Sequence, residues 1–192
     1  MTDKPRYVRP LSPESKGEAP GRKRLEGRRI LVVGGGQRTF DAATDPVGNG
    51  RAMSLLFAKE GAHVAVADIF RASADDTVAR ITAEGGRGFS IEADIAREAD
   101  VSRMVDEAVD GLGGLDGMVL NVGIGVGCPG LVDTPLGRHT SAGRPSRSAA
   151  GVPFGRMATG WEIAYAALFF MSEESVYINA QTLAVDSGIT GL

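Results

Sequence analysis

Short apolar runs alternate along the chain with longer segments in which apolar residues recur at every third or fourth position. The short runs are typical of buried strands, and the wider spacing is typical of helices with one buried face. The predicted strands are Arg29–Val33, His63–Ala67, Gly88–Ile91 and Leu115–Leu120. The predicted helices between them are Gly48–Glu60, Ser73–Glu84 and Ala99–Val109. Strict alternation of strands and helices predicts an α/β fold, in which helices cover both faces of a parallel sheet.

The pattern changes on both sides of this central part. Residues 1–27 contain four prolines and almost no apolar periodicity, which predicts a flexible N-terminal extension ahead of one domain over residues 28–192. Residues 122–157 are rich in Gly, Pro, Ser and Arg and are predicted to form loops. After them the pattern predicts an apolar helix over Thr159–Met171 and a last strand over Thr182–Val185.

Composition narrows the class of protein. Of the 192 residues, 43% are hydrophobic, as in soluble globular proteins, and no apolar run is long enough to span a membrane. The single cysteine, Cys128, excludes an intrachain disulfide and fits a reducing cytoplasm. Residues 1–30 carry nine basic against four acidic residues, whereas the rest of the chain carries twelve against twenty. We interpret the basic segment as a solvated tail and not as a surface for nucleic acid or anionic lipid.

A glycine-rich turn after the first strand carries the clearest chemical signal. Gly34 and Gly36 follow the strand, and Gly48 and Gly50 begin the next helix. Such a turn lets the backbone approach a pyrophosphate, which the positive N-terminal end of the helix then stabilises. Asp68 ends the second strand 18 residues after Gly50, at the offset expected for a carboxylate that binds the adenosine ribose. The alternative is a tight turn that binds nothing.

Asp68 also bears on the choice of cofactor. A carboxylate at this position repels a 2′-phosphate, so the sequence favours NAD over NADP. Arg38 or Arg71 would reverse that preference if either side chain folded over the ribose site.

The glycine turn resembles that of the short-chain dehydrogenase/reductase family. The family's Thr-Gly-x-x-x-Gly-x-Gly turn matches Val33, Gly34, Gly36, Gly48 and Gly50 when the intervening residues 38–47 are taken as an insertion. Valine in place of the family's threonine removes a hydroxyl that usually steadies the turn. The resemblance covers roughly residues 28–192 and implies a Rossmann-like, doubly wound parallel sheet that binds NAD.

Further motifs continue this resemblance along the chain. Asp94, followed by Ile95, matches the acidic residue that contacts adenine in the family. The segment Asn121, Val122 and Gly123 resembles the family's Asn-Ala-Gly, which closes the fourth strand against the cofactor. Pro129 and Gly130, followed by Thr134, resemble the family's Pro-Gly segment, whose backbone and Thr meet the nicotinamide end. The family's C-terminal strand and its exit match Gln181, Thr182, Val185, Asp186 and Gly188. Asn49 lies inside the glycine turn and is included among the predicted cofactor-binding residues.

The chain differs from the family at the catalytic centre. Between Asn-Ala-Gly and Pro-Gly the family places a catalytic Ser and a Tyr-x-x-x-Lys, which needs at least roughly fifty residues. Here only residues 122–128 separate the two motifs, and no Tyr-x-x-x-Lys occurs in the chain. Without a Tyr–Lys pair, proton transfer to a carbonyl has no obvious donor. We therefore assign no catalytic residue, and the sequence leaves open whether the chain is an active enzyme.

Other residues in the loop region are candidate replacements for the missing catalytic groups. His139 is a candidate acid but is more typical of a surface residue, and Cys128 has no partner base near it in the sequence. The family's mobile lid lies in this region, where an anionic substrate could be held by Arg138, Arg144, Arg147 and Arg156. The alternative is a solvated flexible loop. Trp161 and Tyr165 lie on the apolar helix and are predicted to pack. The sequence contains no Cys/His cluster that would indicate a metal site, and no Gly-x-Ser-x-Gly motif that would indicate a hydrolase.

Three functions remain open from the sequence. The first is an oxidoreductase by descent, NAD-dependent on alcohols or ketones, that an internal deletion has left catalytically defective. The second is a nucleotide-binding module without chemistry, and the third is an interaction protein that associates with an intact homologue. The family orders its strands 3-2-1-4-5-6-7, and the fifth strand and most of the sixth are missing here. A right-handed crossover after the fourth strand then predicts about five strands in the order 3-2-1-4-7, with Thr182–Val185 docked beside the fourth strand. The alternative is that the last strand stays at a distance and the gap is filled by another subunit or by nothing. A homo-oligomer through residues 159–171 and the last strand is a further expectation.

Overall fold

A four-stranded parallel sheet forms the centre of the fold. The computed structural model describes residues 8–122, 130–141 and 152–189. The strands are β1 (Arg29–Val33), β2 (His63–Asp68), β3 (Arg87–Glu92) and β4 (Gly117–Leu120), and their order in the sheet is β3-β2-β1-β4. All three pairings are parallel, and Ile30 of β1 lies beside Val64 of β2 and Gly117 of β4. The predicted α/β architecture and its first four strands are confirmed.

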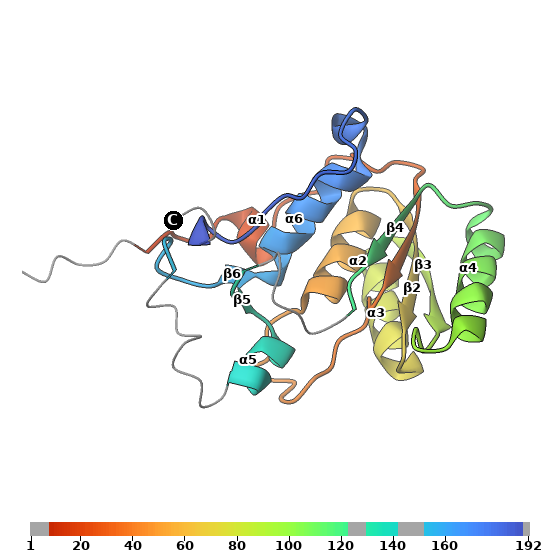
Figure 1. The fold of residues 1–192 in the computed structure, drawn as a ribbon, viewed down its shortest axis with the longest axis horizontal. Coiled ribbons are helices and arrows are strands. Elements are labelled where there is room, and N and C mark those ends of the chain that lie inside the picture. Colours follow the sequence, from red (N-terminus) through yellow and green to blue (C-terminus); the bar gives the residue numbers. More distant parts are fainter. Residues whose placement is uncertain (1–7, 123–129, 142–151, 190–192) are drawn as a thin grey trace, which may run out of the picture.

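Helices cover the two faces of this sheet unequally (Figure 1). On one face lie α2 (Asn49–Lys59), α3 (Arg71–Ala83) and α6 (Gly160–Met171), and on the other lies α4 (Glu98–Leu112). Alternation along β1 divides its side chains between two cores, because Ile30 and Val32 pack towards α2 whereas Leu31 and Val33 pack towards α4. Among the described residues, no helix is long and apolar enough to cross a membrane.

The predicted last strand is wrong. Within residues 152–189, the structure has no strand over Thr182–Val185, and Leu183 is 49% exposed. The segment runs elsewhere because Gly130 donates its N–H to the Val185 carbonyl at 3.2 Å, which holds the end of the segment against residue 130. The order 3-2-1-4-7 therefore fails at its fifth position, and β4 is one of the two edge strands in the described sheet, the other being β3.

One face of β4 is covered and the other is open. On the covered face, Gly117 lies under the Met171 sulfur of α6, since a β-carbon at Gly117 would lie 2.9 Å from that atom. On the α4 face, Met118 is 43% and Leu120 is 67% exposed. Among the described residues, no strand pairs with the outer edge of this apolar strand, and proteins usually protect such an edge.

The loop-rich region contains more order than the sequence predicts. Its described part holds the helix α5 (Pro135–Ser141) and the short strand β5 (Val132–Asp133). β5 pairs in parallel with β6 (Ala158–Thr159), which leads directly into α6. This small second sheet ties the start of α5 to the start of α6.

Residues 13–27 are docked on the domain and do not form the flexible extension that the sequence predicts. The short helix α1 (Pro13–Lys16) packs against α6, and the Leu25 side chain is fully buried. The buried Glu60 carboxylate accepts the backbone N–H groups of Arg22 and Arg24 at 2.9 and 3.0 Å. A buried carboxylate satisfied by two backbone donors fixes the path of this segment.

Candidate functional site

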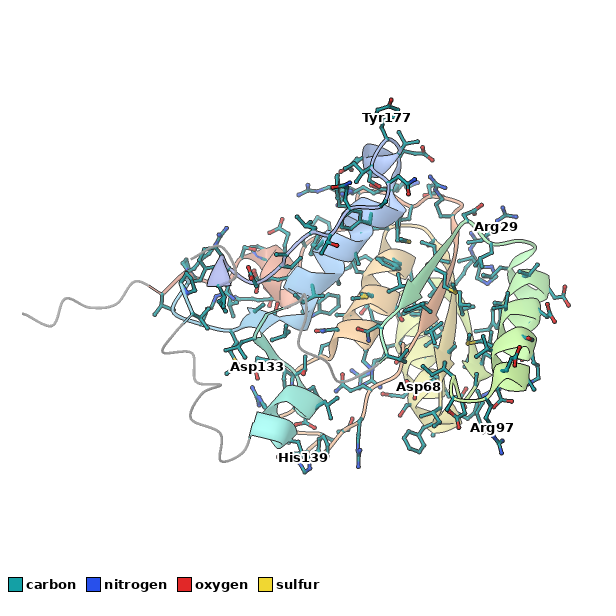
Figure 2. All side chains as sticks on the ribbon, viewed as in Figure 1. Arg29, Asp68, Arg97, Asp133, His139 and Tyr177 are labelled. Carbon is teal, nitrogen blue, oxygen red and sulfur yellow. The ribbon has the colours of Figure 1, made fainter. Side chains whose placement is uncertain are left out.

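A cavity opens at the carboxyl ends of the sheet strands, the end at which Figure 2 places Asp68. Open α/β sheets bind their ligands at this edge. Ten of the predicted cofactor-binding residues line this one cavity: Gly34, Gly36, Gly48, Asn49, Gly50, Asp68, Asp94, Ile95, Asn121 and Thr134. The structure therefore brings together residues that the sequence separates by up to a hundred positions.

The glycine turn lets α2 start directly against β1. A β-carbon at Gly50 would lie 1.8 Å from the Gly34 carbonyl oxygen, so only glycine allows this contact. The Asn121 side chain donates to the same carbonyl at 3.1 Å and links β4 to the turn. In the part of the chain that the structure describes, no side chain caps α2, whose N-cap is Gly48. The first-turn N–H groups of α2 face the cavity end and provide a positive site for a phosphate group.

Backbone donors orient the Asp68 carboxylate at the rim of the cavity. Its Oδ2 accepts the Gly36 N–H at 3.0 Å, and its Oδ1 accepts the Phe70 N–H at 3.1 Å. A β-carbon at Gly36 would lie 2.7 Å from that Oδ2, so glycine is needed for the approach. Each oxygen keeps further acceptor capacity, so a ligand can donate two hydroxyl groups to this carboxylate.

Two apolar side chains form walls beside Asp68. Ile69 is 52% and Ile95 is 46% exposed, and both line the cavity. Asp94 also lines the cavity, and its Oδ1 accepts the Ala96 N–H at 3.0 Å. Exposed isoleucines in the lining suit a flat, apolar ring, and a carboxylate in the same lining suits an amino group on that ring. The sequence singled out Ile95 and Asp94 but missed Ile69.

A glutamine that the sequence analysis missed closes the insertion within the glycine turn. Gln37 accepts the Gly48 N–H at 2.8 Å and donates to the Pro46 carbonyl at 3.3 Å. Gln37 therefore holds together the two ends of the loop over residues 38–47. The signal for it was the insertion itself, because a long loop between Gly36 and Gly48 needs a polar tie across its base.

Asn49 presents an unmet acceptor beside this turn. Among the described residues its Oδ1 is buried and has no hydrogen-bond partner. A buried acceptor without a partner costs about 1–3 kcal/mol, which a ligand donor would recover. Asn49 also lines the cavity, where a ligand hydroxyl group could donate to this atom.

The opposite end of the cavity is less complete. Thr134 lines it, but its Oγ1 already accepts the Gly137 N–H at 3.0 Å at the start of α5. Gly130 is not in the lining and lies against Asp186, since a β-carbon there would be 2.9 Å from the Asp186 Cα. Two other predicted residues of this end, Gly123 and Pro129, lie outside the described residues.

The substitute groups do not assemble a catalytic centre within the described chain. His139 is exposed, does not line the cavity and stacks on Phe40, with ring centroids 4.2 Å apart. Arg138 pairs with both carboxylate oxygens of Asp133, and Arg156 pairs with Glu162. Cys128, Arg144 and Arg147 lie outside the described residues.

The two aromatic residues of α6 pack as predicted. Trp161 lies against Gly17 of the N-terminal segment, and Tyr165 packs against the core, where burial raises the pKa of its hydroxyl. Among the described residues, no group of three or more His, Cys, Asp or Glu side chains could hold a metal ion.

Comparison with known proteins finds a matching family and related proteins. The model of a family described as enoyl-(acyl carrier protein) reductase matches residues 43–127 and 126–190. A short-chain dehydrogenase/reductase of Armillaria gallica is 40% identical over 101 residues, which is 52% of this chain and 35% of that protein. The chain thus spans about a third of the length of this relative.

Two solved structures share the fold. A hydroxysteroid dehydrogenase from Escherichia coli superimposes with a TM-score of 0.75 at 21% identity, over 86% of this chain and 98% of that one. A 7α-hydroxysteroid dehydrogenase complexed with NADH and 7-oxo glycochenodeoxycholic acid superimposes with a TM-score of 0.73 at 20% identity, over 86% and 95%.

Proposed function

Because this chain belongs to the short-chain dehydrogenase/reductase family, we propose that its cavity binds NAD(H) and holds the adenosine half better than the nicotinamide half. The observation that carries the proposal is the convergence of ten predicted residues on one cavity. The adenosine side of that cavity has its walls, its carboxylate and its helix N-terminus. The nicotinamide side is represented by Thr134 and by Asn121 among the described residues.

Each part of the adenosine side receives a role in this proposal. The first turn of α2 holds the pyrophosphate, Asp68 accepts the ribose hydroxyl groups, and Ile69 and Ile95 enclose the adenine beside Asp94. The bound nicotinamide would supply or accept a hydride. NADP is disfavoured because Asp68 would repel a 2′-phosphate, and because Arg71 is paired with Asp75 at 3.1 Å. Arg38 lines the cavity and is the cation through which NADP could still compete.

The chain is an oxidoreductase by descent, and we propose that it does not catalyse hydride transfer on alcohols or ketones. It contains no Tyr-x-x-x-Lys, and the two matches to the family model meet at residues 126–127, where the catalytic segment of the family would lie. Positioned acid–base catalysis contributes about 10²–10⁴-fold to such a reaction. A purified sample should give no absorbance change at the reduced-nicotinamide band. A steady change that survives purification would overturn this part of the proposal and make His139→Ala the next variant.

Calorimetric titration with ADP-ribose tests the binding site. The wild type should bind, and Asp68→Ala should bind roughly ten- to a hundredfold more weakly, since hydrogen bonds to a charged group are worth about 1.5–3 kcal/mol. Asp110→Ala removes an exposed carboxylate of α4 that is not in the cavity lining, so it should bind like the wild type. No binding at millimolar concentration, or equal affinity in Asp68→Ala, would contradict the proposal.

Association with an intact homologue is a second candidate, and the open apolar edge of β4 favours it. Co-expression with a full-length relative should give a complex that co-elutes in gel filtration, and Leu120→Lys should abolish it. A complex that forms equally well with Leu120→Lys would contradict a role for β4. Homo-oligomerisation through α6 stays a prediction; α6 already buries Ile163, Ala164 and Leu168 inside its own chain.

A further inference from the structure

The insertion over residues 38–47 touches α5 through two separate contacts. The Phe40 ring stacks on His139 with centroids 4.2 Å apart and planes 8° apart. The Arg138 Nη1 donates to the Thr44 carbonyl at 2.9 Å. A ring stack and a charged hydrogen bond thus join two segments that lie about a hundred positions apart in the sequence.

On each side of this contact, other interactions fix the residues that form it. Asp45 Oδ2 accepts the N–H groups of Phe40 and Asp41 at 2.6 and 2.9 Å, which fixes the loop that carries the ring. The Arg38 guanidinium lies over the Phe40 ring, with its Cζ 5.2 Å from the ring centroid. On the α5 side, Asp133 binds Arg138 through both carboxylate oxygens at 2.6 and 2.8 Å. The contact therefore joins two preformed surfaces.

The cavity lies between the bases of these two segments. Gln37 and Arg38, at the start of the insertion, line it from one side, and Thr134, Pro135 and Leu136, at the start of α5, line it from the other. The two sides meet at the glycine turn, since a β-carbon at Gly48 would lie 3.9 Å from the Pro135 Cδ. Neither Phe40 nor His139 lines the cavity, so both act on it only through the segments that carry them.

We propose that the Phe40–His139 stack and the Arg138–Thr44 bond form a clasp, which holds α5 as one wall of the cavity and slows the release of a bound dinucleotide. Phe40 and His139 are positioning residues in this proposal. The identity of the ligand as a dinucleotide rests on the proposed function, whereas the two contacts of the clasp are present in the chain without a ligand. The larger effect should fall on NADH, because Thr134 and α5 belong to the nicotinamide end of the cavity.

Hydrogen exchange in the ligand-free protein tests the clasp independently of any nucleotide. The α5 amides should exchange roughly three- to tenfold faster in Phe40→Ala, in line with the energy of an aromatic pair. Phe40→Tyr keeps the stack and should exchange like the wild type. Tyr177→Ala removes a fully exposed aromatic ring at the opposite end of the molecule (Figure 2) and should also leave α5 unchanged. Unchanged exchange in Phe40→Ala would overturn the proposal.

Stopped-flow release of NADH tests the consequence for the ligand. The dissociation rate should rise roughly three- to tenfold in Phe40→Ala and in His139→Ala, and the double variant should be no faster than either, because both remove the same stack. Release of ADP-ribose should change less. Equal NADH release in wild type and Phe40→Ala, or additive effects in the double variant, would contradict the clasp. If the wild type binds no nucleotide, the proposed function fails, and the exchange result still decides whether α5 is clasped.

Discussion

A β-carbon at Gly50 would lie 1.8 Å from the carbonyl oxygen of Gly34, which is backbone and cannot move without displacing the turn. Gly50→Ala should therefore lower the free energy of unfolding by about 3 kcal/mol, at the upper end of overpacking costs. Gly48→Ala is the matched control, because its φ is −74° and its new β-carbon would meet nothing closer than 3.6 Å. Urea unfolding of both variants checks the prediction. Equal stability of Gly50→Ala and Gly48→Ala would contradict this geometry of the turn.

Leu25 shows that the N-terminal segment belongs to the domain. Its side chain is fully buried in the core that includes α2 and α6, whereas Leu11 in the same segment is exposed. Leu25→Ala should lower the free energy of unfolding by about 2–5 kcal/mol, and Leu11→Ala should change it by less than about 0.5 kcal/mol. Denaturant unfolding compares the two. Similar stabilities would mean that the segment is not docked in solution.

The sequence predicts the parts of the fold that depend on local pattern. The limits of β1 come directly from an apolar run. The helix predicted over Thr159–Met171 is α6, whose N-cap is Thr159, and both halves of its capping box, Thr159 and Glu162, lie within four residues. Docking of Leu25 depends on α2 and α6, which lie far away in the sequence, so no local signal announces it. The failure of the strand at Thr182–Val185 has the same origin, because its end is held by the Gly130 N–H, a contact that lies far away in the sequence and that no local pattern predicts.

The candidate site divides in the same way. Gly50 and Asp68 follow from a spacing that one strand, one turn and one helix dictate, so the sequence predicts them. Gln37 and Ile69 become visible only when the loop over residues 38–47 and the end of β2 are folded, because their roles depend on what they face. The contact between Phe40 and His139 joins two regions that look like loops in the sequence, and no periodic pattern predicts it.

The free edge of β4 predicts an alternating pattern of amide protection. The Asn121 N–H donates to the Val33 carbonyl, so alternation points the Val119 N–H towards β1 and the Met118 and Leu120 N–H groups away from it. Val119 and Asn121 should exchange slowly, and Met118 and Leu120 should exchange fast, in NMR-detected hydrogen exchange. Slow exchange at all four amides would show that another strand covers the edge.

The hydrogen-bonded carboxylate of Glu162 should make the free energy of unfolding fall in acid. Burial alone would raise the pKa of this carboxyl, but hydrogen bonds from Arg156, the Thr159 N–H and Ser15 outweigh it and lower the pKa from 4.5 to about 2. Because the folded pKa is the lower one, the stabilisation is complete above pH about 4.5 and is lost as the pH falls through about 2.

Unfolding of Glu162→Gln between pH 7 and pH 2 checks this effect. Relative to the wild type, the variant should lose about 1 kcal/mol near neutral pH, after allowance for solvent screening of a partly exposed pair, and the difference should shrink towards pH 2. Asp106→Asn changes an exposed carboxylate of α4 and should follow the wild type. A constant difference between Glu162→Gln and the wild type at every pH would contradict this role of the charge.

The ratio of the dissociation constants for ADP-ribose and NADH tests most directly whether the adenosine side of the site persists without a complete nicotinamide side. Both constants come from calorimetric titration of the same wild-type sample. We predict that both ligands bind and that NADH binds no more than about tenfold more tightly, which corresponds to about 1.4 kcal/mol from the nicotinamide riboside. NADH binding a hundredfold or more tightly than ADP-ribose, or no binding of either ligand at millimolar concentration, would contradict the account.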